Sequence, residues 1–88
     1  MTDFVAAEIL PTVQKVLGTQ DTIGSDAGLA GWGLDSVLTV NLFMALEEDL
    51  GITFDDEDLV GTNFESIATI LVIANRARSA ALQSAVSD

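Results

Sequence analysis

The sequence GWGLDSVL, residues 31–38, decides how the rest of the chain is interpreted. Two glycines are followed by Asp35 and Ser36, and a strongly apolar segment starts directly after them. Asp and Ser are common N-terminal caps of helices, so this pair marks the start of a helix. A serine hydroxyl at such a position lies beside unpaired backbone amides and can carry an anion.

The segment from Ser36 to Leu50 is the clearest predicted helix, and Gly51 is its expected end. The inward stripe has the spacing of three and four residues that is typical of an amphipathic helix, and consists of Val40, Phe43, Leu46 and Leu50. Other apolar side chains fall outside this stripe, namely Val37, Met44 and Ala45. Exposed apolar side chains of this kind are typical of a surface that contacts a partner.

Before this helix, residues 2–17 form a predicted helix that contains Pro11, where we expect a kink or a fresh helical start. Residues 18–35 form a long predicted loop, which holds a short helical turn or has a functional role. Irregularly spaced apolar residues are its expected anchors, namely Ile23, Leu29, Trp32 and Leu34. Trp32 is interpreted as a core anchor, with a contact beside Ser36 as the alternative.

After Gly51, residues 55–61 can form one or two helical turns. The last helix is predicted to begin near Thr62, because residues 62–65 fit the capping-box pattern. Its inward stripe consists of Phe64, Ile67, Leu71 and Ala74. We therefore expect one all-α domain over residues 1–88, with a helical bundle over about 3–78 and a frayed tail over 79–88.

The composition excludes several classes of function. Fourteen acidic residues face three basic ones, giving a formal charge of −11, which opposes nucleic-acid binding and favours basic protein partners. No signal sequence or membrane-length apolar run is present, so we expect a cytoplasmic protein that does not bind membranes. The acids at residues 55–58 lack the order of a calcium-binding loop, and we predict no metal site.

Ser36 can be interpreted in three ways. As a catalytic nucleophile it would need a base, and the chain has neither histidine nor cysteine, so we predict no catalytic residue. As an N-cap it would be structural only. As an attachment point for a group that another enzyme transfers, it needs no internal base, and the helix N-terminus favours a phosphodiester.

From about Ile9 to Ile73 the sequence resembles the acyl carrier and peptidyl carrier protein family. The motif Asp35-Ser36-Val37 is similar to the Asp-Ser-Leu-like motif of that family, and LFMALEEDLGI, residues 42–52, is similar to its second helix and exit. The resemblance implies a four-helix bundle with a long first loop and a short third helix. Because the chain begins just before the first predicted helix and ends soon after the last, we expect a freestanding, monomeric carrier.

The resemblance also implies a cofactor. Ser36, with Asp35 beside it, would receive a 4′-phosphopantetheine arm from coenzyme A through a phosphopantetheinyl transferase. The arm would carry acyl or aminoacyl groups as thioesters, so that the chain is a substrate of partner enzymes and not an enzyme itself. Those partners would be a loading enzyme, either an adenylation enzyme or an acyltransferase, and condensing or tailoring enzymes.

The predicted partner surface has an apolar and an acidic part. The apolar part consists of Val37, Leu38 and Met44, and the acidic part of Glu47 and Glu48, within a segment of seven acids between residues 47 and 58. Fatty-acid carriers usually have acids where this chain has Leu38 and Asn41. We therefore expect a role in polyketide or nonribosomal peptide biosynthesis, with a fatty-acid carrier, or an interaction module without a prosthetic group, as the alternatives.

Overall fold

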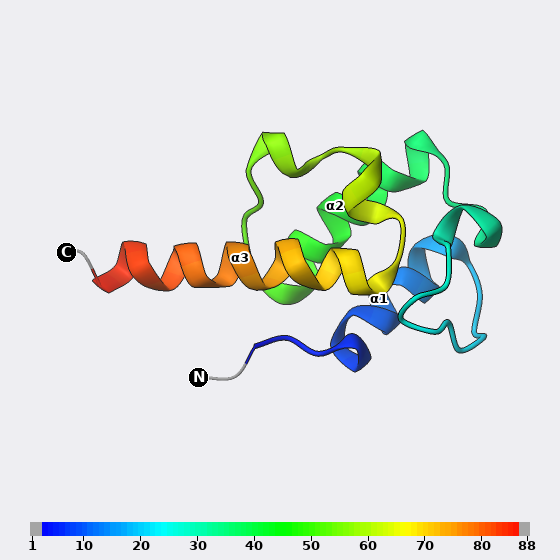
Figure 1. Ribbon diagram of the computed structural model, residues 1–88, viewed down its shortest axis with the longest axis horizontal. Coiled ribbons are helices and arrows are strands. Elements are labelled where there is room, and N and C mark those ends of the chain that lie inside the picture. The colour runs from blue at the N-terminus through cyan, green and yellow to red at the C-terminus, as the bar shows by residue number, and fades with distance from the viewer. Residues whose placement is uncertain (1–2, 87–88) are drawn as a thin grey trace.

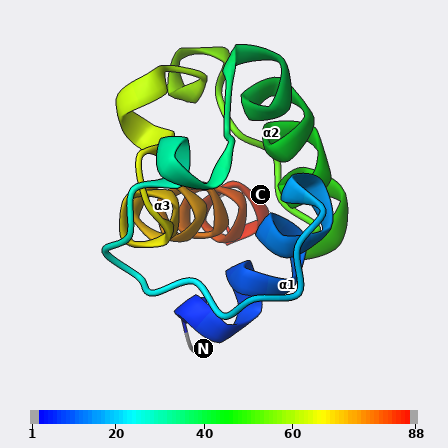
Figure 2. The same cartoon turned by 90° about the vertical axis from the view of Figure 1, so that its right-hand side faces the viewer.

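The computed structural model describes the backbone of residues 3–86 and the side chains of residues 3–80, and this part of the chain contains helices and no strand. The α-helices are α1 (Ala6–Leu17), α2 (Ser36–Leu50) and α3 (Ile67–Val86), and the short 3₁₀ turns are η1 (Leu29–Trp32), η2 (Asp56–Asp58) and η3 (Gly61–Phe64). α1 packs against both α2 and α3, η3 contacts α2 and α3, and the C-terminal half of α3 extends beyond the rest of the molecule (Figures 1 and 2). The predicted all-α class is confirmed.

α1 is one continuous helix that includes Pro11, so of the two expected outcomes, a kink or a fresh start, the fresh start is excluded. Proline removes one helical hydrogen bond, and the helix persists because Ile9 and Val13 on either side of it are fully buried. The helix begins at Ala6, later than expected, because Asn75 of α3 holds the preceding backbone: Phe4 N–H donates to Asn75 Oδ1 at 2.7 Å and Asn75 Nδ2 donates to the Phe4 carbonyl at 3.3 Å.

The long loop contains η1, so the short helical turn that was one of the two expectations for this loop is present. Ile23 and Leu29 are buried as expected, but the interpretation of Trp32 as a core anchor was wrong, because 37% of its surface is exposed. Backbone bonds attach the loop to the start of α3: Leu29 N–H donates to the Glu65 carbonyl at 2.8 Å, and Ala68 N–H to the Ser25 carbonyl at 2.9 Å. These bonds fix η1 and the loop before it at the N-terminal end of α3.

Residues 55–61, for which one or two helical turns were expected, form the 3₁₀ turn η2, and η3 follows directly, so the short third helix of the expected four is a 3₁₀ turn. Aromatic side chains anchor both ends of this segment, since the ring of Phe43 lies 5.0 Å from that of Phe54 and 6.2 Å from that of Phe64. The expected start of the last helix at Thr62 was therefore wrong: burying Phe64 turns the chain inward before an α-helix can continue.

α3 begins one turn later, at Ile67, with a reciprocal cap between two other residues. Ser66 N–H donates to Thr69 Oγ1 at 3.1 Å, and Thr69 N–H donates to Ser66 Oγ at 3.3 Å. The backbone stays helical to Val86, past the point near residue 78 where we expected the bundle to end, while residues 87 and 88 of the expected tail lie outside the described residues.

The core is one cluster shared by the three helices and the loops between them. Its largest fully buried side chains are Phe64, Ile9, Leu29, Leu42, Leu46, Ile67, Ile70, Ile73 and Val13. The inward stripe predicted for α2 was partly right, because Phe43 and Leu46 are buried. Val40 was also expected to be buried but is 41% exposed, and Leu42 is buried instead. No helix within the described residues is long and apolar enough to cross a membrane.

Candidate functional site

Ser36 is the first residue of α2, and Asp35 fixes it there. Asp35 Oδ1 accepts the N–H of Leu38 at 2.8 Å, and the Asp35 carbonyl accepts Thr39 N–H at 2.8 Å and Thr39 Oγ1 at 2.7 Å. Asp35 thus satisfies two amides of the first turn with its side chain and its backbone. The amides of Ser36 and Val37, the two first positions of the helix, have no carbonyl within the helix to bond.

The chain reaches this helix through a tight turn at Gly33. Its φ of +100° lies in the left-handed region that favours glycine. Leu34 then turns back toward the core and is half-buried, with its N–H bonded to the Leu29 carbonyl at 3.1 Å. Ser36, two residues after the half-buried Leu34, is exposed. Its Oγ makes no hydrogen bond within the part of the chain that the structure describes.

Two grooves meet at Ser36. The larger has a volume of about 500 Å³ and lies between the long loop and η3, lined by Gly28, Ala30, Leu34, Asp35, Ser36, Thr39, Gly61, Phe64 and Glu65. The smaller has a volume of about 250 Å³ and is lined by Ser36, Thr39, Val40, Leu59, Val60 and Gly61. A group attached to Ser36 Oγ would therefore have a mainly apolar surface on both sides.

Exposed apolar residues extend from Ser36 along α2. Val37 is 68% exposed and Met44 is 60% exposed, as the sequence predicted. Leu38 was also expected to be exposed, but it is half-buried. Val40 joins the exposed pair on the same side of the helix, because residues three and four apart share a face. We use the name apolar face for the surface that consists of Val37, Val40, Met44, Leu59 and Val60.

The acids at the end of α2 are partly engaged within the fold. Glu47 is half-buried, and its Oε2 accepts the Phe54 N–H at 2.9 Å, so it holds the chain after the helix. Glu48 is exposed and free of such a bond within the described residues. Of the predicted acidic partner residues, only Glu48 is therefore fully available to another protein.

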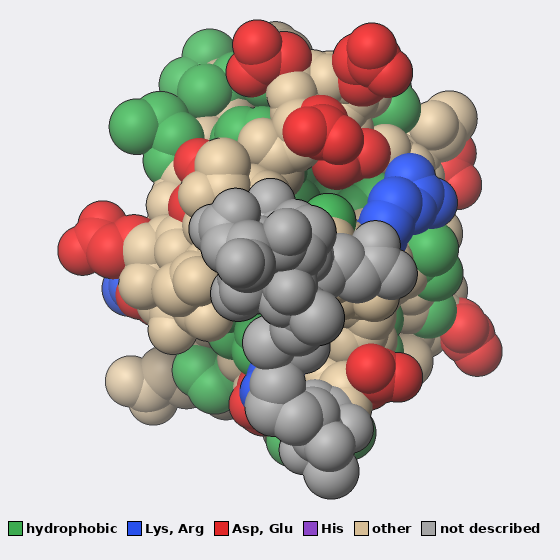
Figure 3. Space-filling model, turned by 90° about the vertical axis from the view of Figure 1, so that its left-hand side faces the viewer, with side chains coloured by type: hydrophobic (Ala, Val, Ile, Leu, Met, Phe, Trp, Pro, Cys, Tyr) green, Lys and Arg blue, Asp and Glu red, His purple; other side chains and the backbone are tan. Residues whose placement is uncertain are grey.

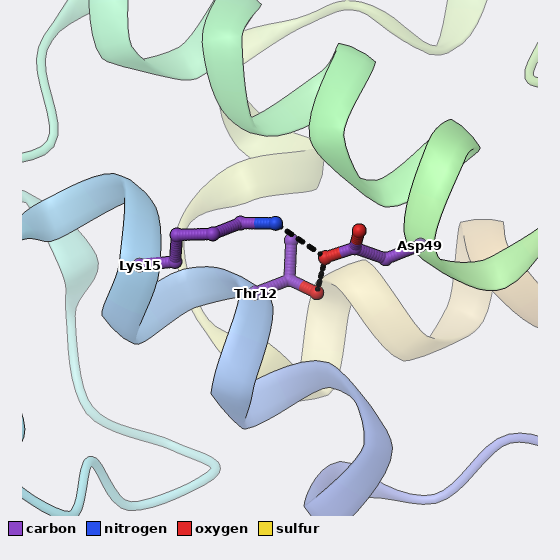
Figure 4. Close-up of polar contacts among 3 residues, drawn as sticks. All are labelled: Thr12, Lys15 and Asp49. Carbon is purple, nitrogen blue, oxygen red and sulfur yellow. Dashed lines mark hydrogen bonds and ion pairs between the residues drawn. The ribbon is translucent and has the colours of Figure 1, made fainter.

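Asp49 joins α2 to α1 (Figure 4). Its Oδ2 accepts Lys15 Nζ at 2.9 Å and Thr12 Oγ1 at 2.7 Å. The hydrogen bond from Lys15, followed by that from Thr12, lowers the pKa of Asp49 from its ordinary value of 3.8. A carboxylate near the C-terminus of a helix is unfavourable because that end carries the negative pole of the helix dipole, and the bonds to Lys15 and Thr12 compensate for this placement.

All three basic side chains of the protein lie against other groups of the same chain. Lys15 bonds Asp49, Arg76 Nη1 lies 3.7 Å from Asp58 Oδ1, and the Arg78 guanidinium lies 4.7 Å from the ring centre of Phe4. On the face shown in Figure 3, acidic side chains stand out around the edge and basic ones are few. The outer field of the protein is therefore negative.

Residues 7–75 match the family model described as "Phosphopantetheine attachment site", so the chain belongs to this family of carrier domains. Among solved structures, it is similar to the solution structure of oxytetracycline acyl carrier protein, with a TM-score of 0.68 and 19% identity over 92% of this chain and 88% of that chain. No curated protein sequence matches it.

These matches confirm the resemblance to acyl carrier proteins and the all-α fold of that type. They also confirm 4′-phosphopantetheine as the expected covalent prosthetic group. The residues near Ser36 fit that group, since its exposed hydroxyl, which makes no hydrogen bond within the described residues, opens onto two grooves.

The sequence did not indicate the residues that come to Ser36 from later in the chain. Leu59, Val60, Gly61 and Phe64 line the grooves, although more than twenty residues separate each of them from Ser36. The one available signal was Phe64, which lies in a predicted inward stripe. Nothing local predicted that η3 would fold back beside the start of α2.

Proposed function

We propose that this carrier protein bears its 4′-phosphopantetheine arm on Ser36. The observation that carries the proposal is an exposed hydroxyl that has no partner among the described residues, at the first position of a capped helix, in a chain whose residues 7–75 match the attachment-site family. Asp35 contributes by positioning: its bonds to Leu38 and Thr39 keep Ser36 at the helix start.

The attachment reaction requires a separate transferase. Ser36 Oγ forms a bond to the phosphorus that carries the pantetheine in coenzyme A, the bond from that phosphorus to the 3′,5′-ADP part breaks, and the hydroxyl proton passes to a base of the transferase. The chain has no histidine, and the carboxylate nearest in sequence, that of Asp35, accepts a hydrogen bond from the Leu38 amide. The thiol of the bound arm carries acyl or aminoacyl groups as thioesters.

We assign partner recognition to the apolar face together with Glu48. Val37, Val40 and Met44 follow α2 away from Ser36, and Glu48 lies one turn beyond Met44, exposed. An apolar surface beside an acidic one fits enzymes with an apolar docking site and a basic rim. The small number of acids near Ser36 supports a role in polyketide or nonribosomal peptide biosynthesis rather than in fatty-acid synthesis.

The test is incubation with coenzyme A, Mg²⁺ and a promiscuous phosphopantetheinyl transferase, followed by intact mass spectrometry. We expect a gain of one phosphopantetheine group, absent from the variant Ser36→Ala and present in Ser25→Ala, which removes another exposed loop serine. An unchanged wild-type mass beside an active control carrier would contradict the proposal and favour an interaction module without a prosthetic group.

A further inference from the structure

Trp32 is the largest of the exposed apolar side chains in the part of the chain that the structure describes. It lies on η1, four residues before Ser36, and 37% of its surface is exposed. It lines neither of the two grooves that meet at Ser36. Tryptophan is among the residues that contribute most to protein–protein binding when a partner buries them. Trp32 is therefore a candidate for a contact in a complex.

η1 presents this ring on a fixed backbone. The turn begins at Leu29, which is fully buried and donates its N–H to the Glu65 carbonyl at 2.8 Å. A Cβ added to Gly31 or Gly33, the two neighbours of Trp32, would meet no other part of the chain within 4 Å. The space on both sides of the ring is thus open. A side chain on an ordered turn loses less conformational freedom on binding than one on a mobile loop.

Trp32 is close enough to Ser36 to be covered by an enzyme that acts on the serine itself. The four residues between the two positions span at most about 14 Å. An interface of standard size covers about 800 Å² of each partner, which corresponds to a radius of about 16 Å. Met44 lies about 12 Å from Ser36 along α2, at the usual rise of the helix. An interface centred on Ser36 therefore includes Trp32 as well as much of the apolar face.

This requirement separates the phosphopantetheinyl transferase from the other partners. The transferase forms a bond to Ser36 Oγ, so its active site must come within bonding distance of the serine, whereas enzymes that act on the thioester work at the far end of the arm. The charges agree with this partner. The ionisable side chains that line the larger groove, Asp35 and Glu65, are acidic, and the transferase needs basic groups to hold the phosphates of coenzyme A.

We propose that Trp32 is a contact residue for the phosphopantetheinyl transferase, and that its indole ring enters an apolar pocket beside the basic coenzyme A site of that enzyme. This role rests on the proposed attachment at Ser36. Trp32 precedes the serine and the apolar residues of α2 follow it, so the enzyme gains apolar contacts on both sides along the chain. Contacts on two sides orient Ser36 Oγ toward the reacting phosphorus more strictly than contacts on one side.

The experiment measures initial rates of loading by a phosphopantetheinyl transferase that modifies the wild type, with coenzyme A and Mg²⁺, by intact mass spectrometry. The concentration of the unmodified carrier is varied, so that kcat and KM are obtained separately. Trp32→Ala should raise KM about tenfold and leave kcat within about twofold, because the ring contributes to binding and not to the chemical step. Trp32→Phe keeps an aromatic ring and should stay within about threefold of the wild-type KM.

Val72→Ala is the matched control. Val72 is also apolar and is 58% exposed, but it lies on α3 and lines neither groove. Its KM should stay within about twofold of the wild type, as expected for a residue outside the contact. Circular dichroism checks that each variant is folded.

A second measurement needs no substitution at Trp32. The chain contains one tryptophan, so carrier grown with 5-fluorotryptophan gives a single ¹⁹F signal. In labelled Ser36→Ala, which cannot be loaded, this signal should shift or broaden when unlabelled transferase and coenzyme A are added. In the labelled wild type without transferase, the signal should be the same before and after loading, because the ring contacts the enzyme and not the arm.

Failure to load the wild type would contradict the attachment at Ser36 itself. With normal loading of the wild type, an unchanged KM in Trp32→Ala, an effect confined to kcat, or an equal rise of KM in Val72→Ala would overturn the role of Trp32 alone. A ¹⁹F signal that does not respond to the transferase would also overturn it. A signal that shifts on loading in the absence of the transferase would assign the ring to the arm instead.

Discussion

The two ends of α2 use their polar side chains in opposite ways. At the first turn, Asp35 bonds the helix and leaves Ser36 Oγ without a partner among the described residues. At the last turns, Glu47 bonds the Phe54 amide and Asp49 bonds Lys15 and Thr12. The acid-rich end therefore serves the fold to a large extent, while the N-terminal end leaves the Ser36 hydroxyl exposed.

The largest expected difference lies between buried and exposed apolar residues of this helix. Leu46→Ala removes a fully buried side chain and should lower the free energy of unfolding by about 2–5 kcal/mol, whereas Val37→Ala, at an exposed position, should change it by less than about 0.5 kcal/mol. Urea denaturation followed by circular dichroism measures both. A loss at Val37 as large as that at Leu46 would show that Val37 packs against the core.

At the N-terminal end, Asp35→Ala should lower the free energy of unfolding by about 0.5–2 kcal/mol, because the Leu38 amide loses its acceptor. Asp35→Asn is the matched variant, since asparagine caps helices about as well as aspartate, and it should retain most of the stability. The same denaturation experiment compares the two. Equal losses in both variants would mean that the charge of Asp35, not its cap, matters.

At the C-terminal end, neighbouring glutamates should behave differently. Glu47→Ala leaves the Phe54 amide without its acceptor and should cost about 0.5–1.5 kcal/mol of unfolding free energy. Glu48→Ala should change stability by less than about 0.5 kcal/mol, while weakening the binding of a basic partner enzyme. Urea denaturation measures the stability of each variant, and titration with a partner enzyme measures its binding. A larger loss of stability in Glu48→Ala than in Glu47→Ala would contradict this assignment.

The smallest effect concerns pH. The pKa of Asp49 is lowered in the folded protein, so its ionised form stabilises the fold above its ordinary pKa of 3.8, and this contribution is lost as the pH falls through the lower folded value. Asp49→Asn should therefore lose less stability than the wild type between about pH 5 and pH 2. Urea denaturation at a series of pH values measures this loss. An equal loss of unfolding free energy in the two proteins would contradict the prediction.

Local sequence signals were sufficient for α2. Its cap at Asp35, its apolar spacing and the stop at Gly51 predicted a helix over residues 36–50, which is the helix observed. They failed at Thr62, where a capping-box pattern is present but the helix starts at Ile67. There the packing of Phe64 against Phe43 outweighs a cap that contributes only about 1 kcal/mol.

Exposure was harder to predict than helix position. Trp32 and Val40 were assigned to the core and are exposed, while Leu42 is fully buried. Periodicity identifies which residues share a face, but the helix can rotate by one residue to place its best-fitting side chains inside. The neighbours that decide this rotation come from other parts of the chain.

The sequence by itself determined the helical class, the place of Ser36 at the start of α2 and the negative charge of the protein, because caps, periodicity and composition are local properties. Only the tertiary structure decided which acids are free and which residues surround Ser36. Loop bonds to the start of α3 and the burial of Phe64 bring η1 and η3 beside this serine. Contacts between residues so distant along the chain are fixed by packing, which no local pattern contains.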